Sequence, residues 1–183
     1  MNPNPSNEMM TASEYLDSLN DGREVYIYGE KVLDVTKHRA FRNSAYSMSR
    51  LYEALHDPDS SQILTDIEPE GFITHRYFMP SRSSEDLLKA RSAIAYWSRL
   101  SYGFMGRTPD YKAGFTATLK SDPRLYAPFT DNAIKWYRKT ASKVLFLNHV
   151  LVNPPIGRAR DIADMRDIYL HALLGSTVPC KNS

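Results

Sequence analysis

Apolar residues recur every three or four positions over much of the chain, which is the spacing of one face of an α-helix. This spacing predicts helices at residues 11–19, 43–56, 83–102 and 108–119, and a longest helix from Thr130 to about residue 147 or 149. In the second of these, the predicted buried positions are Ala45, Met48, Leu51, Tyr52 and Leu55. The first and third begin with a Ser or Thr followed closely by an acidic residue, which is a capping signature. The pattern therefore predicts a mainly α-helical protein.

The pattern changes at residues 23–35, where apolar and polar residues alternate as in a half-buried strand. We predict a β-hairpin here, with its turn at Gly29-Glu30, and expect it to pack on the helices because an isolated hairpin is marginally stable. Residues 57–71 contain Pro and Gly and predict a loop, followed by a short extended segment at residues 72–78. We expect a flexible, disordered N-terminus at residues 1–10, which are polar and rich in Pro and Asn.

The composition is that of an ordinary soluble domain, with 42% hydrophobic and 24% charged residues in a chain of 183. This length predicts one domain, with or without a tail. The net charge is +2 and the Lys and Arg residues are scattered, which disfavours a nucleic-acid-binding protein. We find no signal-peptide pattern and no apolar run of membrane-spanning length, so we expect no membrane association and a cytoplasmic location.

Several common catalytic and metal-binding patterns are missing from the sequence. The five histidines are far apart and the single cysteine, Cys180, offers no thiolate cluster, so we expect no metal site. There is also no glycine-rich phosphate loop and no nucleophile elbow. Two short stretches remain as candidates for chemistry.

The first candidate stretch is Ser101–Tyr111, which turns on Gly103 and Gly106 between two predicted helices. Arg107 lies in this turn and Tyr111 follows four residues later, which allows the two side chains to converge on one ligand. A guanidinium group binds carboxylates through its planar fork, and a phenol hydroxyl donates or accepts a hydrogen bond. The alternative is an ordinary helix–turn–helix corner, with Arg107 in water and Tyr111 half buried.

The second candidate stretch is Phe146–Pro155, in which His149 lies within an apolar run that ends in a rigid Asn-Pro-Pro. A histidine in apolar surroundings can hydrogen-bond a phenol or a flavin oxygen, or transfer a proton. The alternative is a structural His149 whose ring is satisfied by a backbone carbonyl.

Four motifs, in order along the chain, resemble those of one known family. They are GREVYIYGEKV at residues 22–32, TxHxAFRN at 36–43, WSRLSYGFMGRTPDYKA at 97–113 and FLNHVLVNPP at 146–155. The sequence resembles the 4-hydroxyphenylacetate 3-monooxygenase oxygenase component family, which comprises flavin-dependent phenol hydroxylases. The wider family includes 4-hydroxybutyryl-CoA dehydratase, but the iron–sulfur cluster of that branch needs several cysteines.

The resemblance implies a fold as well as an activity. Residues 11–170 are expected to form a helical N-terminal domain like that of acyl-CoA dehydrogenases, with a small β-hairpin. In full-length members a β-barrel domain and a C-terminal helical domain follow, and the subunits form homo-oligomers. We expect both later domains to be absent here, because residues 171–183 form an atypical tail without the family pattern.

The resemblance also implies roles for particular residues. The family positions that contact the phenolic substrate match Arg107, Tyr111 and His149. His149 is the implied catalytic residue, since a hydrogen bond to the phenol oxygen favours phenolate character and a nucleophilic ortho carbon. The flavin-facing positions match His149, Val150, Leu151, Pro155, Ile156 and Arg158, with a departure at Gly157, where the family usually has an acidic residue.

The implied activity is ortho-hydroxylation of a phenol, such as 4-hydroxyphenylacetate, to a catechol. The implied co-reactants are O2 and reduced FAD, the latter supplied by a separate NADH:flavin reductase. The alternative is a catalytically inactive truncated homologue, or a helical interaction domain. The particular phenol stays open, as does the choice between FAD and FMN.

Overall fold

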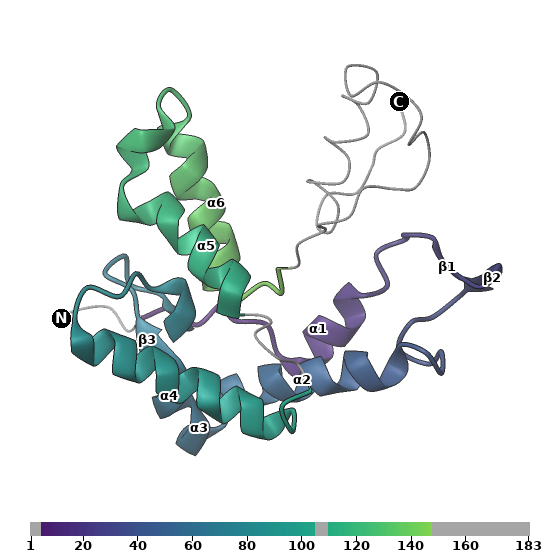
Figure 1. Cartoon of the computed structure of the whole chain (residues 1–183). Helices are drawn as coiled ribbons and strands as arrows, with labels where there is room; N and C mark the ends of the chain where they lie inside the picture. Colours follow the sequence, from purple (N-terminus) through teal and green to yellow (C-terminus); the bar gives the residue numbers. More distant parts are fainter. Residues whose placement is uncertain (1–4, 105–109, 148–183) are drawn as a thin grey trace, which may run out of the picture. The chain divides into compact units, whose positions relative to one another are not determined.

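The computed structural model describes residues 5–104 and 110–147, without the side chains of Asp110 and Tyr111. As predicted, the described chain is mainly helical, with six α-helices and two pairs of short antiparallel strands (Figure 1). In chain order the elements are α1 (Ala12–Ser18), β1 (Val25–Ile27), β2 (Glu30–Val32), α2 (Arg42–His56), α3 (Pro58–Leu64), β3 (Thr65–Ile67), β4 (Ile73–His75), the 3₁₀ helix η1 (Arg76–Phe78), α4 (Ser84–Leu100), α5 (Asp110–Ser121), the 3₁₀ helix η2 (Pro123–Tyr126) and α6 (Thr130–Ser142). None of the described helices is long and apolar enough to cross a membrane.

Helices α1 and α2 pack against each other, and α2 supplies much of the core. The capping box predicted at Thr11 forms, because its hydroxyl accepts from the Glu14 N–H at 3.3 Å and the Glu14 carboxylate accepts from the Thr11 N–H at 2.7 Å. Tyr15 of α1 stacks on Tyr52 of α2, with ring centroids 4.8 Å apart. The buried face predicted for α2 is confirmed: Ala45, Met48, Leu51, Tyr52 and Leu55 are each at most 5% exposed.

The predicted hairpin forms from β1 and β2, but its turn lies one residue earlier than predicted. Ile27 pairs with Glu30, so Tyr28 and Gly29 occupy the turn, with φ of 50° and 81°. A two-residue hairpin turn favours positive φ at both central residues because that conformation matches the twist of the strands. The hairpin packs less on the helices than we expected: within residues 25–32 only Val32 is buried.

The stretch at residues 57–71 was predicted as a loop, and this prediction is wrong. Asp57 caps α3 by accepting from the Ser60 N–H at 2.9 Å, and Pro58 occupies the first helical position. Strand β3 follows and pairs with β4. Asp-Pro favours a helix start as well as a loop, and a helix of seven residues is too short to show a clear apolar period.

The structure also differs from the disorder expected at residues 1–10, within the part that is described. The Ser6 N–H donates to the Gly71 carbonyl at 2.8 Å, and Ser6 accepts from the Ile73 N–H at 2.9 Å. Met9 is only 5% exposed. This segment therefore extends the second strand pair with two backbone hydrogen bonds that a polar composition does not reveal.

A buried carboxylate joins the second strand pair to the last two helices. Glu68, in the turn between β3 and β4, is 1% exposed. Its carboxylate forms an ion pair with Lys120 of α5 and accepts a hydrogen bond from the Tyr137 hydroxyl of α6. Burial, together with the hydrogen bond to Glu68, raises the pKa of Tyr137, so this hydroxyl stays protonated and donates. Because both carboxylate oxygens have partners, the charge is tolerated away from water.

Replacing Lys120 with Met removes the countercharge of Glu68. We expect K120M to lower the free energy of unfolding by about 3 kcal/mol. This value is at the lower end for a broken buried ion pair, because Lys120 keeps partial contact with water. Lys89→Met is the matched control: Lys89 lies 2.7 Å from Glu85, but both side chains are largely solvated, so we expect a loss below about 1 kcal/mol. Urea unfolding measures both, and equal losses would contradict the role of the Glu68 pair.

Candidate functional site

Most of the predicted site residues lie outside the part of the chain that the structure describes. These are Arg107, His149, Val150, Leu151, Pro155, Ile156 and Arg158. For Tyr111 only the backbone is described, as the second residue of α5. The structure therefore describes the helical frame, meaning the helices that flank these segments in the sequence.

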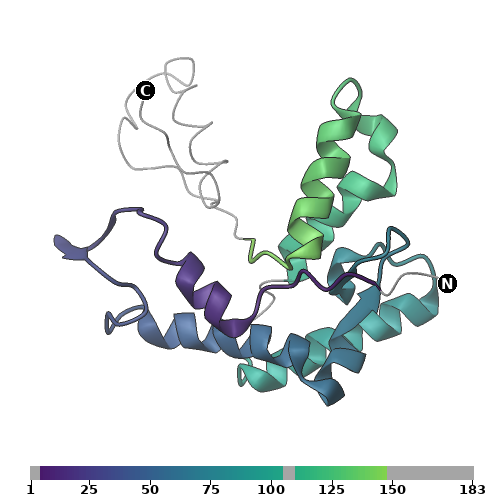
Figure 2. The ribbon, with the colours of Figure 1, turned by 180° about the vertical axis from the view of Figure 1, so that it is seen from behind.

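Helices α5 and α6 form the central part of this frame. They pack side by side as an antiparallel pair connected through η2 (Figures 1 and 2). The start of α5 at Asp110 and the end of α6 at Ser142 consequently lie at the same end of the pair. In the sequence, Arg107 precedes α5 and His149 follows α6.

Helix α4, which precedes the Arg107 segment, ends in a Schellman motif. The Gly103 N–H donates to the Ser98 carbonyl at 2.7 Å, and the Tyr102 N–H donates to the Arg99 carbonyl at 3.1 Å. Tyr102 occupies the left-handed position of this motif with φ of 52°. Glycine usually occupies this position because it has no Cβ to clash. Here Tyr102 occupies it, so the turn begins one residue before Gly103, the glycine that predicted the turn.

Helix α6, which precedes the His149 segment, ends in the same motif. The Leu145 N–H donates to the Thr140 carbonyl at 2.9 Å, and the Val144 N–H donates to the Ala141 carbonyl at 3.2 Å. Val144 has φ of 49°, a left-handed conformation that costs about 1–2 kcal/mol for a β-branched residue. The helix therefore ends at Ser142, whereas the sequence predicted an end near residue 147 or 149. The prediction that this would be the longest helix is also wrong, because α4 is the longest described helix.

Two buried hydroxyl groups hold the end of α6. Tyr52 of α2 donates to the Val144 carbonyl at 2.7 Å, and Thr74 of β4 donates to the Ala141 carbonyl at 2.8 Å. The side chains of both are at most 2% exposed. Burial, and then the neighbouring Tyr15, raises the pKa of Tyr52, so its hydroxyl remains a donor. Neither contact was predicted, because nothing local in the sequence links these residues.

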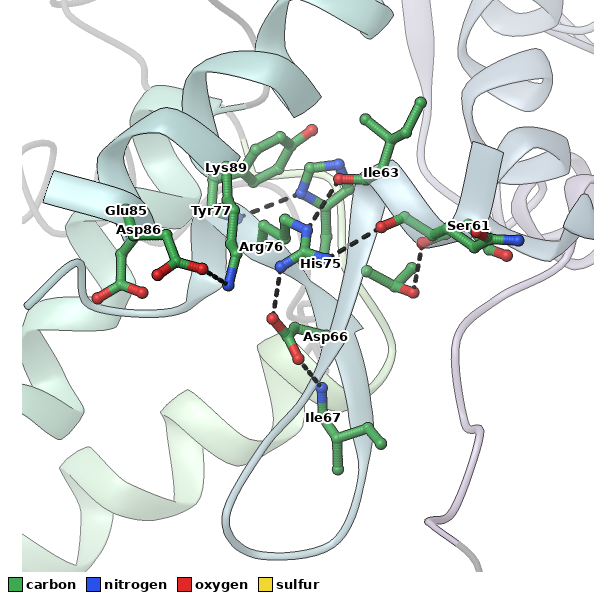
Figure 3. Close-up of polar contacts among 12 residues, drawn as sticks. Ser61, Ile63, Asp66, Ile67, His75, Arg76, Tyr77, Glu85, Asp86 and Lys89 are labelled. Atoms are coloured by element: carbon green, nitrogen blue, oxygen red, sulfur yellow. Dashed lines mark hydrogen bonds and ion pairs between the residues drawn. The ribbon is translucent and has the colours of Figure 1, made fainter. Parts of the chain in front are cut away.

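A buried aromatic cluster of His75, Tyr77 and Trp97 lies between η1 and α4. The ring centroids of His75 and Trp97 are 4.8 Å apart, and those of Tyr77 and Trp97 are 5.2 Å apart, edge to face. His75 is fully buried, and its Nδ1 accepts from the Tyr77 N–H at 3.3 Å (Figure 3). Burial, and then the charge of Arg76, holds the pKa of His75 well below its ordinary value of 6.5. His75 is therefore a neutral core histidine.

A cavity of about 270 Å³ has Asp66, Arg76, Asp86 and Lys89 in its wall, and none of the three cluster residues lines it. Arg76 pairs with Asp66 and donates to the Ile63 carbonyl at 2.9 Å, and Lys89 pairs with Glu85 (Figure 3). The wall is charged and its groups largely satisfy one another, whereas sites for flat organic ligands are mostly apolar. We assign no ligand to this cavity.

Comparison with known proteins identifies the class of this helical frame. Residues 11–173 match the family described as 4-hydroxyphenylacetate 3-hydroxylase N terminal. The chain belongs to this family, which confirms the resemblance drawn from its four motifs.

Three relatives give the extent of the match. The chain is 50% identical over 165 residues to the pyoverdin chromophore biosynthetic protein PvcC of Pseudomonas aeruginosa, covering 90% of this chain and 33% of that protein. It is 52% identical over 163 residues to a 4-hydroxyphenylacetate 3-monooxygenase oxygenase component of the same species, covering 87% and 31%. A crystal structure of such a component, HpaB, complexed with FAD and 4-hydroxyphenylacetate has a TM-score of 0.72 at 32% identity, covering 83% and 32%. The chain thus spans about a third of the length of these relatives.

Protonation of His75 should destabilise the fold. Its pKa is lowered in the folded state, so the unfolded state binds the proton more readily as the pH falls below about 6.5. We expect the free energy of unfolding to be greatest above pH 6.5 and to decrease below it, by up to about 1.4 kcal/mol per pH unit for one group.

Urea unfolding between about pH 7.5 and 5 measures this slope, above the range in which most carboxylates titrate. His75→Asn keeps an acceptor near the Tyr77 N–H but removes the titration, so its slope should be flatter. His56→Gln is the control, because His56 is exposed and the slope should persist. A slope unchanged in H75N would contradict the assignment.

Proposed function

We propose that this chain is the substrate-side, N-terminal part of a two-component monooxygenase. The reaction is hydroxylation of a phenol ortho to its hydroxyl group, with O2 and reduced FAD as co-reactants. The observation that carries the proposal is the match of residues 11–173 to the family described as 4-hydroxyphenylacetate 3-hydroxylase N terminal. It is supported by relatives named as 4-hydroxyphenylacetate 3-monooxygenase oxygenase components.

Three residues have distinct roles in binding and activating the phenol. Arg107 pairs with a carboxylate on the substrate, through the planar fork that suits carboxylate geometry. Tyr111, four residues further along the chain, hydrogen-bonds the substrate beside it. His149 hydrogen-bonds the phenol oxygen and holds or accepts its proton, which raises electron density at the ortho carbon.

The flavin side of the site consists of residues that suit such a group in chemical kind. Val150, Leu151 and Ile156 are apolar and fit the face of an aromatic ring system, whereas His149 and Arg158 are donors for its oxygens or phosphates. Bound reduced FAD supplies the activation of O2. The residues of this chain bind and orient the phenol, hold its proton and exclude water.

The proposal extends to partners that support this reaction. A separate NADH:flavin reductase delivers the reduced FAD, and the subunits associate as a homo-oligomer. Both belong to the activity of the whole family member, of which this chain corresponds to about a third.

A second candidate function is a helical interaction domain without catalysis of its own. It is favoured by large apolar side chains on the α5–α6 pair and its connection that face solvent: Phe115, Leu125 and Phe129 are each at least 65% exposed. Apolar surface of this kind marks sites of protein contact. In this case the chain binds another protein through these side chains but binds no flavin.

An anaerobic titration of the purified chain with reduced FAD, beside gel filtration, separates the two functions. A folded chain with saturable binding supports the proposed monooxygenase part, and hydroxylation with O2, a reductase and 4-hydroxyphenylacetate is then the further test. A folded chain without flavin binding contradicts the monooxygenase proposal and favours the second function, a helical interaction domain.

Replacement of Arg107 tests the carboxylate contact by comparing two phenols. We expect R107A to weaken binding of 4-hydroxyphenylacetate about tenfold or more, since a hydrogen bond to a charged group contributes about 1.5–3 kcal/mol. Binding of the neutral 4-methylphenol should change less than about twofold. Calorimetric titration measures both, and similar losses for the two phenols would exclude the contact. Arg99→Ala, which removes a cation near the end of α4, is the control.

A further inference from the structure

The β1–β2 hairpin is an exposed element with few contacts to the rest of the described chain. Both views show it apart from the helices (Figures 1 and 2). Within residues 25–32 only Val32 is buried, whereas Tyr26, Tyr28 and Leu33 are 58%, 103% and 88% exposed. A two-stranded hairpin is marginally stable alone, and grouped apolar side chains in water mark contact surfaces. The hairpin therefore has the properties of a surface that contacts another chain.

The two edges of the hairpin differ in how they are protected against pairing with a further strand. Strand β2 carries Glu30 and Lys31, and charged residues on an edge strand, Lys above all, discourage such pairing. Strand β1 consists of Val25, Tyr26 and Ile27, none of which is charged. Among the described residues, β1 pairs with β2 only. The unprotected edge is therefore that of β1.

The backbone of Tyr26 is oriented for pairing at this edge. Residues along an antiparallel strand alternate between bonding to the partner strand and pointing away from it. Ile27 pairs with Glu30 across the two-residue turn, so its backbone groups are directed at β2. The N–H and carbonyl of Tyr26 consequently point to the free edge. A strand that pairs there meets one donor and one acceptor at its centre.

A second copy of the same edge fits this arrangement. In a two-fold antiparallel pair centred on Tyr26, the two Tyr26 residues would exchange both backbone hydrogen bonds. Each Val25 would then lie opposite Ile27 of the other copy, and each Glu24 would lie opposite Tyr28. No two like charges face each other in this register, and the central positions are all apolar or aromatic. The β1 edge is thus complementary to itself.

The same symmetry does not suit β2, and this limits the size of the assembly. A β2 pair centred on Lys31 would place two like charges directly opposite each other, which is destabilising. Pairing therefore stops at four strands, with Glu30 and Lys31 on both outer edges. Because side chains alternate between faces, Val25, Ile27 and Val32 lie on one face of the hairpin, and the pairing joins this face to that of the second copy.

We propose that the β1 edge, Val25–Ile27, is a self-association surface at which two copies of this chain form a four-stranded antiparallel sheet. A contact between two three-residue strands is small, so it gives a reversible monomer–dimer equilibrium rather than a permanent dimer. The pairing needs neither flavin nor phenol and is independent of the proposed activity. Absence of flavin binding would count against the proposed function and would leave this inference unchanged.

Proline substitutions on the two edges test the surface. Tyr26→Pro removes the N–H that points to the free edge of β1, and Lys31→Pro is the matched control because it removes the corresponding N–H of β2. We expect the dissociation constant of the dimer to rise about tenfold or more in Y26P, since two symmetry-related hydrogen bonds are lost. In K31P it should change less than about twofold, because the Lys31–Glu24 pair that is also lost is exposed.

Sedimentation equilibrium from micromolar to millimolar concentration measures the mass of each chain. A monomeric unsubstituted chain over this whole range would overturn the proposal, as would a dimer that persists in Y26P. Equal losses in Y26P and K31P would also overturn it, because the contact would then not lie at the β1 edge. Phe115→Ser should leave the dimer intact, and loss of the dimer in F115S alone would place the contact on the α5–α6 pair instead.

Tyr26→Glu keeps the proposal testable if Y26P does not fold. Within its own hairpin the new carboxylate lies opposite Lys31, which supports the pairing of β1 with β2. In the dimer the two carboxylates would face each other at the centre of the contact, so we expect at least a tenfold rise in the dissociation constant. An unchanged dissociation constant in Y26E would exclude the two-fold pairing centred on Tyr26.

Discussion

A charge buried away from water must be paired, and the charge of Glu68 determines how the described part of this protein is joined. Its carboxylate lies in the turn between β3 and β4, yet its partners, Lys120 and Tyr137, come from α5 and α6. If either helix moved away, a charge or a hydroxyl group would stay buried without a partner, which would lower the free energy of unfolding by several kcal/mol. One side chain thus fixes both helices of the pair against the strand turn.

This joint and the hydroxyl anchors act at different points along the same helix. Glu68 holds Tyr137 in the middle of α6, whereas Thr74 and Tyr52 hold its C-terminal end at Ala141 and Val144. The helix that precedes the His149 segment therefore has little freedom to rotate or slide. Catalytic groups need such support, because small misplacements greatly reduce rates.

The sequence predicts those parts of the fold that depend on neighbours along the chain. The capping box at Thr11 and the buried face of α2 are local, and both are confirmed. The end of α6 is not local, since Tyr52 lies 92 positions before Val144. The same holds for the pairing of Ser6 with the second strand pair. The candidate site rests on family motifs, because an Arg in a turn and a His in an apolar run are common in structural roles.

The burial of Glu68 has a consequence for the effect of dissolved salt. Exposed pairs such as Arg124–Asp122 interact through water and are screened over a Debye length of about 8 Å at 0.15 M ionic strength. Glu68 is 1% exposed, so its pairing with Lys120 and Tyr137 is screened less than that of a surface pair. The α5–α6 pair should thus stay attached to the strand turn over a wide range of ionic strength, while the surface charges lose their mutual attraction.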